Sequence, residues 1–178
     1  MKPCMMDLSE GLARLNSFGA AEAETELLKC CGSTGWARAL SARRPFVDAP
    51  ELFASSDEVW WNLSEADWLE AFAAHPRIGG RDRAARAQHA QAEDWSRQEQ
   101  ASARDAARAT LEELAAANRA YEEKFGHIFI VCATGKTADE MLSLLHARLS
   151  NEASTEFRIA AGEQSKITRL RLEKLLTT

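Results

Sequence analysis

The sequence lacks the long apolar segments of membrane and secreted proteins. It contains no run of about 18 uninterrupted apolar residues, the length that a membrane-spanning helix needs. The first residues, MKPCMMDLSEG, contain no apolar stretch of the kind found in secretory signals, and the last, LLTT, differ from the Ser-Lys-Leu peroxisomal signal. We therefore expect a cytoplasmic protein without a membrane partner.

Cysteine and histidine are also scarce, and their spacing is not that of a metal site. The four cysteines are Cys4, Cys30, Cys31 and Cys132, and they form neither a CxxC pair nor a zinc-ligand pattern. No HExxH and no histidine pair four residues apart occurs among the four histidines. We expect reduced thiols and no metal ion. The absence of GxSxG also gives no support for a serine nucleophile.

Aromatic residues make up only 7% of the chain, whereas Ala, Leu, Glu and Arg are abundant, which favours helices over sheets. The formal charge is −5, from 22 basic and 27 acidic residues, and nucleic-acid binders normally carry a basic surface. We therefore expect no nucleic-acid partner and favour a small-molecule substrate. With no repeat or Gly/Ser linker, the 178 residues are predicted to form a single domain, 1–178.

Capping residues and breakers divide the chain into helices. Ser64 with Asp67 and Thr137 with Glu140 have the spacing of capping boxes, and Gly126 is a typical helix stop. The apolar run HIFIVCA (127–133) is read as an extended buried connector. The prediction is an all-α bundle of roughly eight helices. The expected helices cover 8–16, 20–31, 35–42, 50–61, 64–75, most of 81–124 in two or three pieces, 138–150 and 154–176.

The stretch AFAAHPRIGG (71–80) places a histidine directly before a proline. Proline disfavours the α conformation in the residue before it, so His75 should lie at the broken end of a helix, where its side chain can face a cavity. Gly79 and Gly80 would let the backbone approach a ligand. The alternative is a helix-terminal histidine that binds the last carbonyls.

Polar residues interrupt one apolar face of the helix that follows. At 100° per residue, Ser96, Glu99 and Gln100 fall in line with alanines and leucines and offer a hydroxyl, a carboxylate and an amide to one small volume. Arg97 and Gln98 face elsewhere. The alternative is a solvated stripe on a surface helix.

An arginine interrupts the apolar side of the last helix. The helical phase puts Arg171 near the middle of this side and Arg169 on the opposite face. Because a guanidinium keeps its charge, Arg171 should point at an anion; the alternatives are an internal Asp or Glu partner, or a stem that covers apolar surface. The apolar side consists of Phe157, Ala160, Gln164, Ile167, Leu170 and Leu175.

Five segments in order resemble the 2-oxo-4-hydroxy-4-carboxy-5-ureidoimidazoline (OHCU) decarboxylase family. The segment AHPRIGG is similar to its His-Pro-Arg-(Leu/Ile)-Gly motif, WSRQEQ to its Ser-x-x-Glu-Gln motif, and YEEKFGHIFIVCATG to its Tyr-x-x-(Lys/Arg)-Phe-Gly and Phe-Ile-Val segments. RLSN and KITRLRLEKL follow in the family's order. The resemblance spans most of the chain.

The resemblance implies an all-helical, cofactor-free enzyme, commonly a homodimer, that decarboxylates OHCU to (S)-allantoin in uric acid degradation. It implies that the catalytic residues are His75, Glu99 and Arg171. Through matching motif positions it implies a substrate-binding set of Pro76, Ser96, Arg97, Gln98, Gln100, Phe129, Ile130, Val131, Cys132 and Ala133, the last five through backbone atoms. Two rival functions stay open: a helical scaffold whose polar residues pair internally, and a related small-acid decarboxylase or hydrolase.

Overall fold

The structure is a computed structural model that describes residues 8–76 and 97–177, with side chains described for all of these except 97–107. This part of the chain contains eight helices and no strand, which confirms the predicted all-α class. The helices are α1 (Ser9–Ser17), α2 (Ala20–Cys30), α3 (Thr34–Ser41), α4 (Ala49–Trp61), α5 (Glu65–Ala73), α7 (Arg97–Phe125), α8 (Ala138–Arg148) and α9 (Ala153–Thr177).

The helix boundaries follow the capping residues that the sequence offers. At the start of α5, the Ser64 hydroxyl accepts from the Asp67 N–H, and the Asp67 carboxylate accepts from the Ser64 N–H. Thr137 and Glu140 form the same reciprocal pair at the start of α8. The chain leaves α7 at Gly126, whose φ of 75° is a conformation that glycine adopts without strain. Both predicted capping boxes are therefore confirmed.

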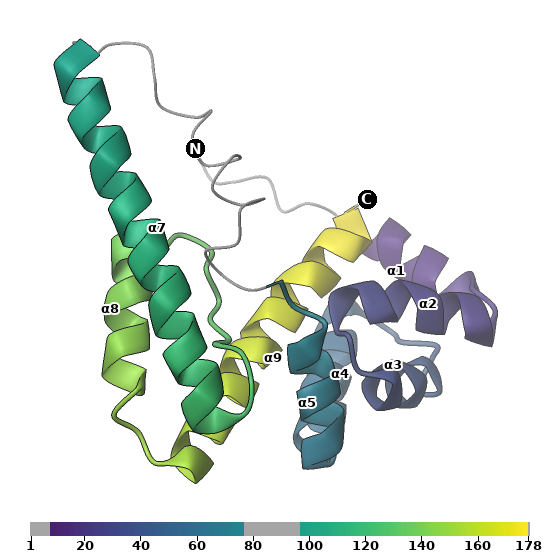
Figure 1. Cartoon of the computed structure of the whole chain (residues 1–178). Helices are drawn as coiled ribbons and strands as arrows, with labels where there is room; N and C mark the ends of the chain where they lie inside the picture. Colours follow the sequence, from purple (N-terminus) through teal and green to yellow (C-terminus); the bar gives the residue numbers. More distant parts are fainter. Residues whose placement is uncertain (1–7, 77–96, 178) are drawn as a thin grey trace. The chain divides into compact units, whose positions relative to one another are not determined.

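The chain divides into two compact units, of which the first contains residues 1–75 and 161–178. Within it, hydrogen bonds join the part of α9 from Ala161 onward to α1, α2 and α4 (Figure 1). The core contains three buried tryptophans whose indole N–H groups all donate to backbone carbonyls: Trp36 to Ser56, Trp60 to Ala161, and Trp68 to Trp60. A buried indole with its N–H bonded keeps its apolar contribution without a desolvation cost.

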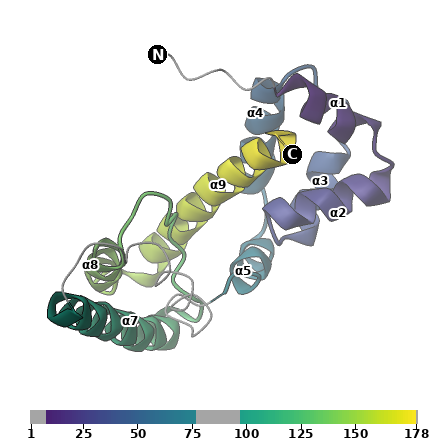
Figure 2. The same ribbon diagram turned by 90° about the horizontal axis from the view of Figure 1, so that it is seen from above.

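The second unit contains residues 76–160. In its described part, α8 lies side by side with α7, as both ribbon views show (Figure 1 and Figure 2). The segment 127–133 between them forms no strand and is largely buried, as expected of the connector. The core of this unit consists of Leu114, Ala117, Tyr121, Phe129, Val131 and Leu145. A single domain over 1–178 stays a prediction.

The face of α9 that is buried differs from the predicted apolar side. Leu170 is 41% exposed, and Ile167 and Leu175 are only half-buried. Polar residues with hydrogen-bond partners, such as Gln164 and Thr168, occupy the buried face instead, because a bonded polar group can be buried without penalty. The buried residues of α9 are Glu156, Ala160, Ala161, Gln164, Thr168, Leu172 and Leu176.

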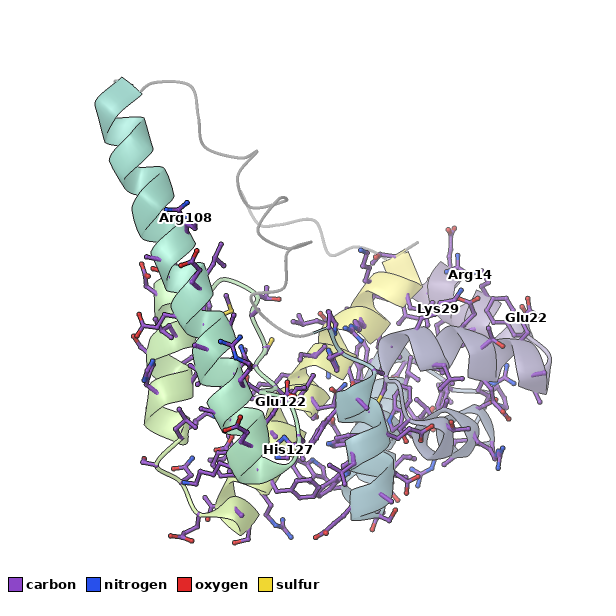
Figure 3. The ribbon with its side chains drawn as sticks, viewed as in Figure 1. Arg14, Glu22, Lys29, Arg108, Glu122 and His127 are labelled. Carbon is purple, nitrogen blue, oxygen red and sulfur yellow. The ribbon has the colours of Figure 1, made fainter. Side chains whose placement is uncertain are left out.

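Charged side chains cover the outer faces of the helices. Glu22 and Lys29 on α2 are exposed, as is Arg14 on α1, whose guanidinium donates to the backbone oxygen of Leu175 (Figure 3). No helix in the described part of the chain is long and apolar enough to cross a membrane.

Candidate active site

His75 lies where α5 ends. The Ala74 N–H donates to Glu70, the His75 N–H donates to Phe72, and Pro76 follows, so the last turn tightens and the helix stops. The half-buried imidazole does not cap these carbonyls through its Nε2 atom, which lies 2.6 Å from Oε1 of Gln164 on α9. The break before proline thus directs His75 toward a residue 89 positions later in the chain.

Gln164 is completely buried and uses both ends of its amide. Its oxygen faces His75, and its nitrogen donates to the hydroxyl of Thr168 at 3.1 Å and contacts the sulfur of Cys31 at 3.9 Å. A buried amide is stable only when its donors and acceptor are bonded. The orientation of Gln164 is therefore set by three side chains from three different segments.

Gly32 brings the end of α2 close to the end of α5. A Cβ atom at Gly32 would lie 2.2 Å from the Cβ atom of Ala74, which is far closer than two carbon atoms can approach. Only glycine lets the chain pass here. The close approach places Cys31 beside Gln164 and next to the helix end that carries His75.

Arg171 lies seven residues after Gln164, and two turns of an α-helix advance about 10.5 Å on the same side. The guanidinium is half-buried and donates to the backbone oxygen of Cys30, the last residue of α2, at 3.3 Å. No salt bridge between Arg171 and a carboxylate occurs among the residues that the structure describes. Its positive charge is thus met by a helix C-terminus and remains available to an anion.

Cys30 and Cys31 are buried thiols beside this arginine. Burial raises the pKa of Cys30 to about 12 and that of Cys31 to about 11, although the nearby Arg171 charge acts in the opposite direction. Both thiols are protonated at neutral pH and are not nucleophiles. This part of the first unit therefore combines a group suited to proton transfer, His75, with a cation held at the end of α2, Arg171.

Arg169 is not simply a solvated residue on the opposite face. Its guanidinium lies 3.5 Å from the centre of the Phe53 ring and forms a salt bridge with Glu173 at 2.8 Å. Arg169 thus has a carboxylate partner one turn away and an aromatic ring from α4 as a second partner, whereas Arg171 has no carboxylate partner among the described residues.

The connector segment 129–133 lies in the second unit. Phe129, Ile130 and Val131 are buried, and Cys132 and Ala133 are half-buried. The backbone oxygen of Ile130 accepts a hydrogen bond from the Arg148 guanidinium at 2.8 Å. The predicted substrate contacts of the five residues are not tested by these positions.

Arg148 is itself held by a buried acid. Glu156 is fully buried, forms a salt bridge with Arg148 at 2.5 Å, and accepts from the Tyr121 hydroxyl and from the Asn151 amide. Burial and the hydrogen bond to Glu156 raise the pKa of Tyr121, so this hydroxyl stays a donor. The network fixes the connector backbone at Ile130. Tyr121 and Arg148 lie in the quoted segments YEEKFG and RLSN, but the pattern alone did not indicate a network.

Most of the remaining predicted site residues lie outside the described side chains. Arg97, Gln98, Glu99 and Gln100 lie in the first turn of α7, and their side chains are outside the described part. Ser96, Gly79 and Gly80 are outside the described residues altogether, and Pro76 is exposed beside His75. Gln164 was missed as a site residue, although an amide within a predicted apolar face was a signal.

The chain is similar to proteins that are named for uric acid degradation or for OHCU decarboxylation. It is 41% identical over 155 residues to the uric acid degradation bifunctional protein TTL of Arabidopsis thaliana, covering 86% of this chain and 47% of that protein, so it spans about half of that relative's length. It is 34% identical over 145 residues to the 2-oxo-4-hydroxy-4-carboxy-5-ureidoimidazoline decarboxylase of Amia calva, covering 79% of each chain.

A solved structure and a family model agree with these relatives. The crystal structure of an OHCU decarboxylase in the presence of (S)-allantoin matches with a TM-score of 0.70 and 38% identity, over 86% of this chain and 98% of that one. The family model described as OHCU decarboxylase matches residues 16–173, nearly the whole chain. The resemblance seen in the sequence motifs is thereby confirmed: the chain belongs to the OHCU decarboxylase family.

Proposed function

We propose that this protein decarboxylates OHCU to (S)-allantoin in uric acid degradation, without a cofactor. The observation that carries the proposal is the arrangement on α9, where a buried amide holds the proton-transfer group His75 and a guanidinium without a carboxylate partner among the described residues follows two turns later. The identity of the substrate is inferred from membership of the OHCU decarboxylase family.

The chemistry needs proton transfer and charge stabilisation. When the carboxylate leaves as CO₂, its bonding electron pair moves into the adjoining C=N unit of the substrate ring, so no separate electron acceptor is required. His75 relays the proton of the C4 hydroxyl or delivers a proton to one face of the carbanion-like centre, because imidazole exchanges protons near neutral pH. Delivery to a single face gives one enantiomer of allantoin.

The other predicted residues bind and orient. Arg171 holds an anionic or carbonyl oxygen of the substrate through a charge-assisted hydrogen bond. Glu99 and Gln100 orient ureido or ring N–H groups, and Ser96, Arg97, Gln98 and Pro76 complete the substrate-binding set with backbone atoms of residues 129–133. These assignments rest on the family resemblance, residue by residue.

Assembly and location are part of the same proposal. The protein is proposed to be a cytoplasmic homodimer, and the family resemblance supports the dimer. The net charge of −5 supports a protein without a nucleic-acid or anionic-membrane partner. Light scattering of the purified protein tests the dimer.

The test is turnover of freshly generated OHCU, followed by circular dichroism of the allantoin formed. His75→Asn should lower kcat by about 10²-fold or more, the contribution of a positioned proton-transfer group. The matched control is His146→Asn, because His146 is an exposed histidine on α8. Racemic product and no acceleration by the unsubstituted protein would favour a scaffold, and turnover of another small acid would favour a related decarboxylase or hydrolase.

A further inference from the structure

The side chain of Gln164 has no exposed surface and lies within hydrogen-bond distance of the His75 ring. The separation of 2.6 Å between His75 Nε2 and Gln164 Oε1 is slightly below the usual range of about 2.7 to 3.2 Å for an N–H···O hydrogen bond, and a contact between two nitrogens would be longer still. The atom of the amide that faces the ring is therefore its oxygen. An amide oxygen only accepts, so Nε2 carries a hydrogen.

The other end of the amide is consistent with this orientation. The Gln164 nitrogen has two hydrogens to donate, and it faces the Thr168 hydroxyl and the Cys31 sulfur. The Thr168 hydroxyl accepts from Gln164 and can in turn donate to Cys31, whose sulfur it also contacts. A series of hydrogen bonds thus runs from the His75 ring through Gln164 and Thr168 to the Cys31 thiol. In each of them one group donates and the next accepts.

We propose that Gln164 is a positioning residue that keeps neutral His75 in the Nε2–H tautomer, so that Nδ1 is the ring nitrogen that gains and loses the reacting proton. The hydrogen bond in its buried setting also fixes the rotation of the ring. The catalytic consequence rests on the proposed function of His75, whereas the tautomer is a property of the protein alone.

The tautomer can be measured without any substrate. In two-bond ¹H–¹⁵N correlation spectra of protein labelled with ¹⁵N-histidine, the His75 signals are those that disappear in His75→Asn. At a pH where the ring is neutral, we expect Nε2 to have the shift of a protonated nitrogen and Nδ1 that of a bare one. The opposite pattern would overturn the proposal, even if OHCU is turned over.

Kinetics of two Gln164 variants test the positioning role. Gln164→Leu has a similar volume but no hydrogen bond, so we expect a mixture of tautomers and a kcat about tenfold lower, the rate equivalent of one ordinary hydrogen bond. KM should change little, because Gln164 does not bind substrate in this proposal. Ser165→Ala, at the next position of α9, is the matched control, since Ser165 bonds Asp57 instead. An unchanged kcat in Gln164→Leu would refute the role.

Gln164→Glu keeps an acceptor for Nε2–H but adds a negative charge. The charges that act on Cys31, which contacts Gln164, are those of Arg171 and of Glu70 on α5, and the two thiols at the end of α2 are neutral at neutral pH. A carboxylate beside the ring should favour the imidazolium form, so kcat should fall at neutral pH and recover as the pH rises. A purely structural role for Gln164 predicts a pH profile of the same shape as that of the unsubstituted protein, which would contradict the proposal.

Discussion

Replacing Arg171 by methionine separates substrate binding from structural stabilisation. The change removes the hydrogen bond to the Cys30 oxygen at the end of α2 but keeps most of the apolar stem. We expect the free energy of unfolding to fall by about 1 kcal/mol, the value of one hydrogen bond at a helix C-terminus. If Arg171 also holds a substrate oxygen, kcat/KM should fall by about 2 to 4 kcal/mol, or about 30- to 1,000-fold.

Arg169→Met is the matched control on the same helix. It removes the cation from the Phe53 ring and the salt bridge to Glu173, which together contribute about 1 kcal/mol to stability. The two variants should therefore melt at similar temperatures, while only Arg171→Met loses activity. Thermal unfolding and OHCU kinetics are measured on both proteins. Equal kcat/KM values would refute the reasoning, and a loss of several kcal/mol of stability in Arg171→Met would make Arg171 a structural residue.

Three further predictions concern the buried network, a buried histidine and metal ions. Glu156→Gln leaves the Arg148 charge without its carboxylate partner and should lower the free energy of unfolding, measured in urea, by roughly 3 kcal/mol. The control Glu152→Gln, at an exposed position, should change this free energy little. A loss below about 1 kcal/mol in Glu156→Gln would contradict the prediction. Burial lowers the pKa of His127, which lies just beyond the end of α7 (Figure 3), so the unfolded chain binds more protons below about pH 6.5 and stability falls as the pH drops. The decrease in melting temperature between about pH 7.5 and 5.5 should be smaller in His127→Phe, and an equal decrease would refute the assignment. EDTA should leave activity unchanged, because the sequence contains no metal-ligand pattern; loss of activity that a divalent cation restores would contradict this.

The helix boundaries could be predicted because their causes are local. Ser64 with Asp67 and Thr137 with Glu140 are three residues apart, and a side chain at this spacing reaches the backbone N–H groups that the first turn leaves unbonded. Such pairs act in the same way in any fold. Gly126 is a similar case, because its left-handed conformation ends α7 whatever packs around it.

The partners of the polar residues could not be predicted, because they lie far away in the sequence. His75 and Gln164 are 89 residues apart, and Arg171 and Cys30 are 141 apart. Helical phase treats Gln164 only as an interruption of an apolar face, and it gives no means of knowing that an imidazole and a thiol satisfy it. For the same reason helical phase placed Leu170 on the buried face, whereas the structure buries residues whose polar groups are hydrogen-bonded and leaves Leu170 exposed.

Because the thiols of Cys30 and Cys31 are protonated, the end of α2 should react slowly with thiol reagents. Alkylating reagents and peroxides react with thiolates, so Cys30 and Cys31 in the folded protein hardly react at neutral pH, and their own burial restricts access further. When the end of α2 separates from α9, both sulfurs reach water and their reactivity rises together. The rate at which a thiol reagent labels Cys30 and Cys31 should therefore measure how often the structure around His75 and Arg171 opens locally.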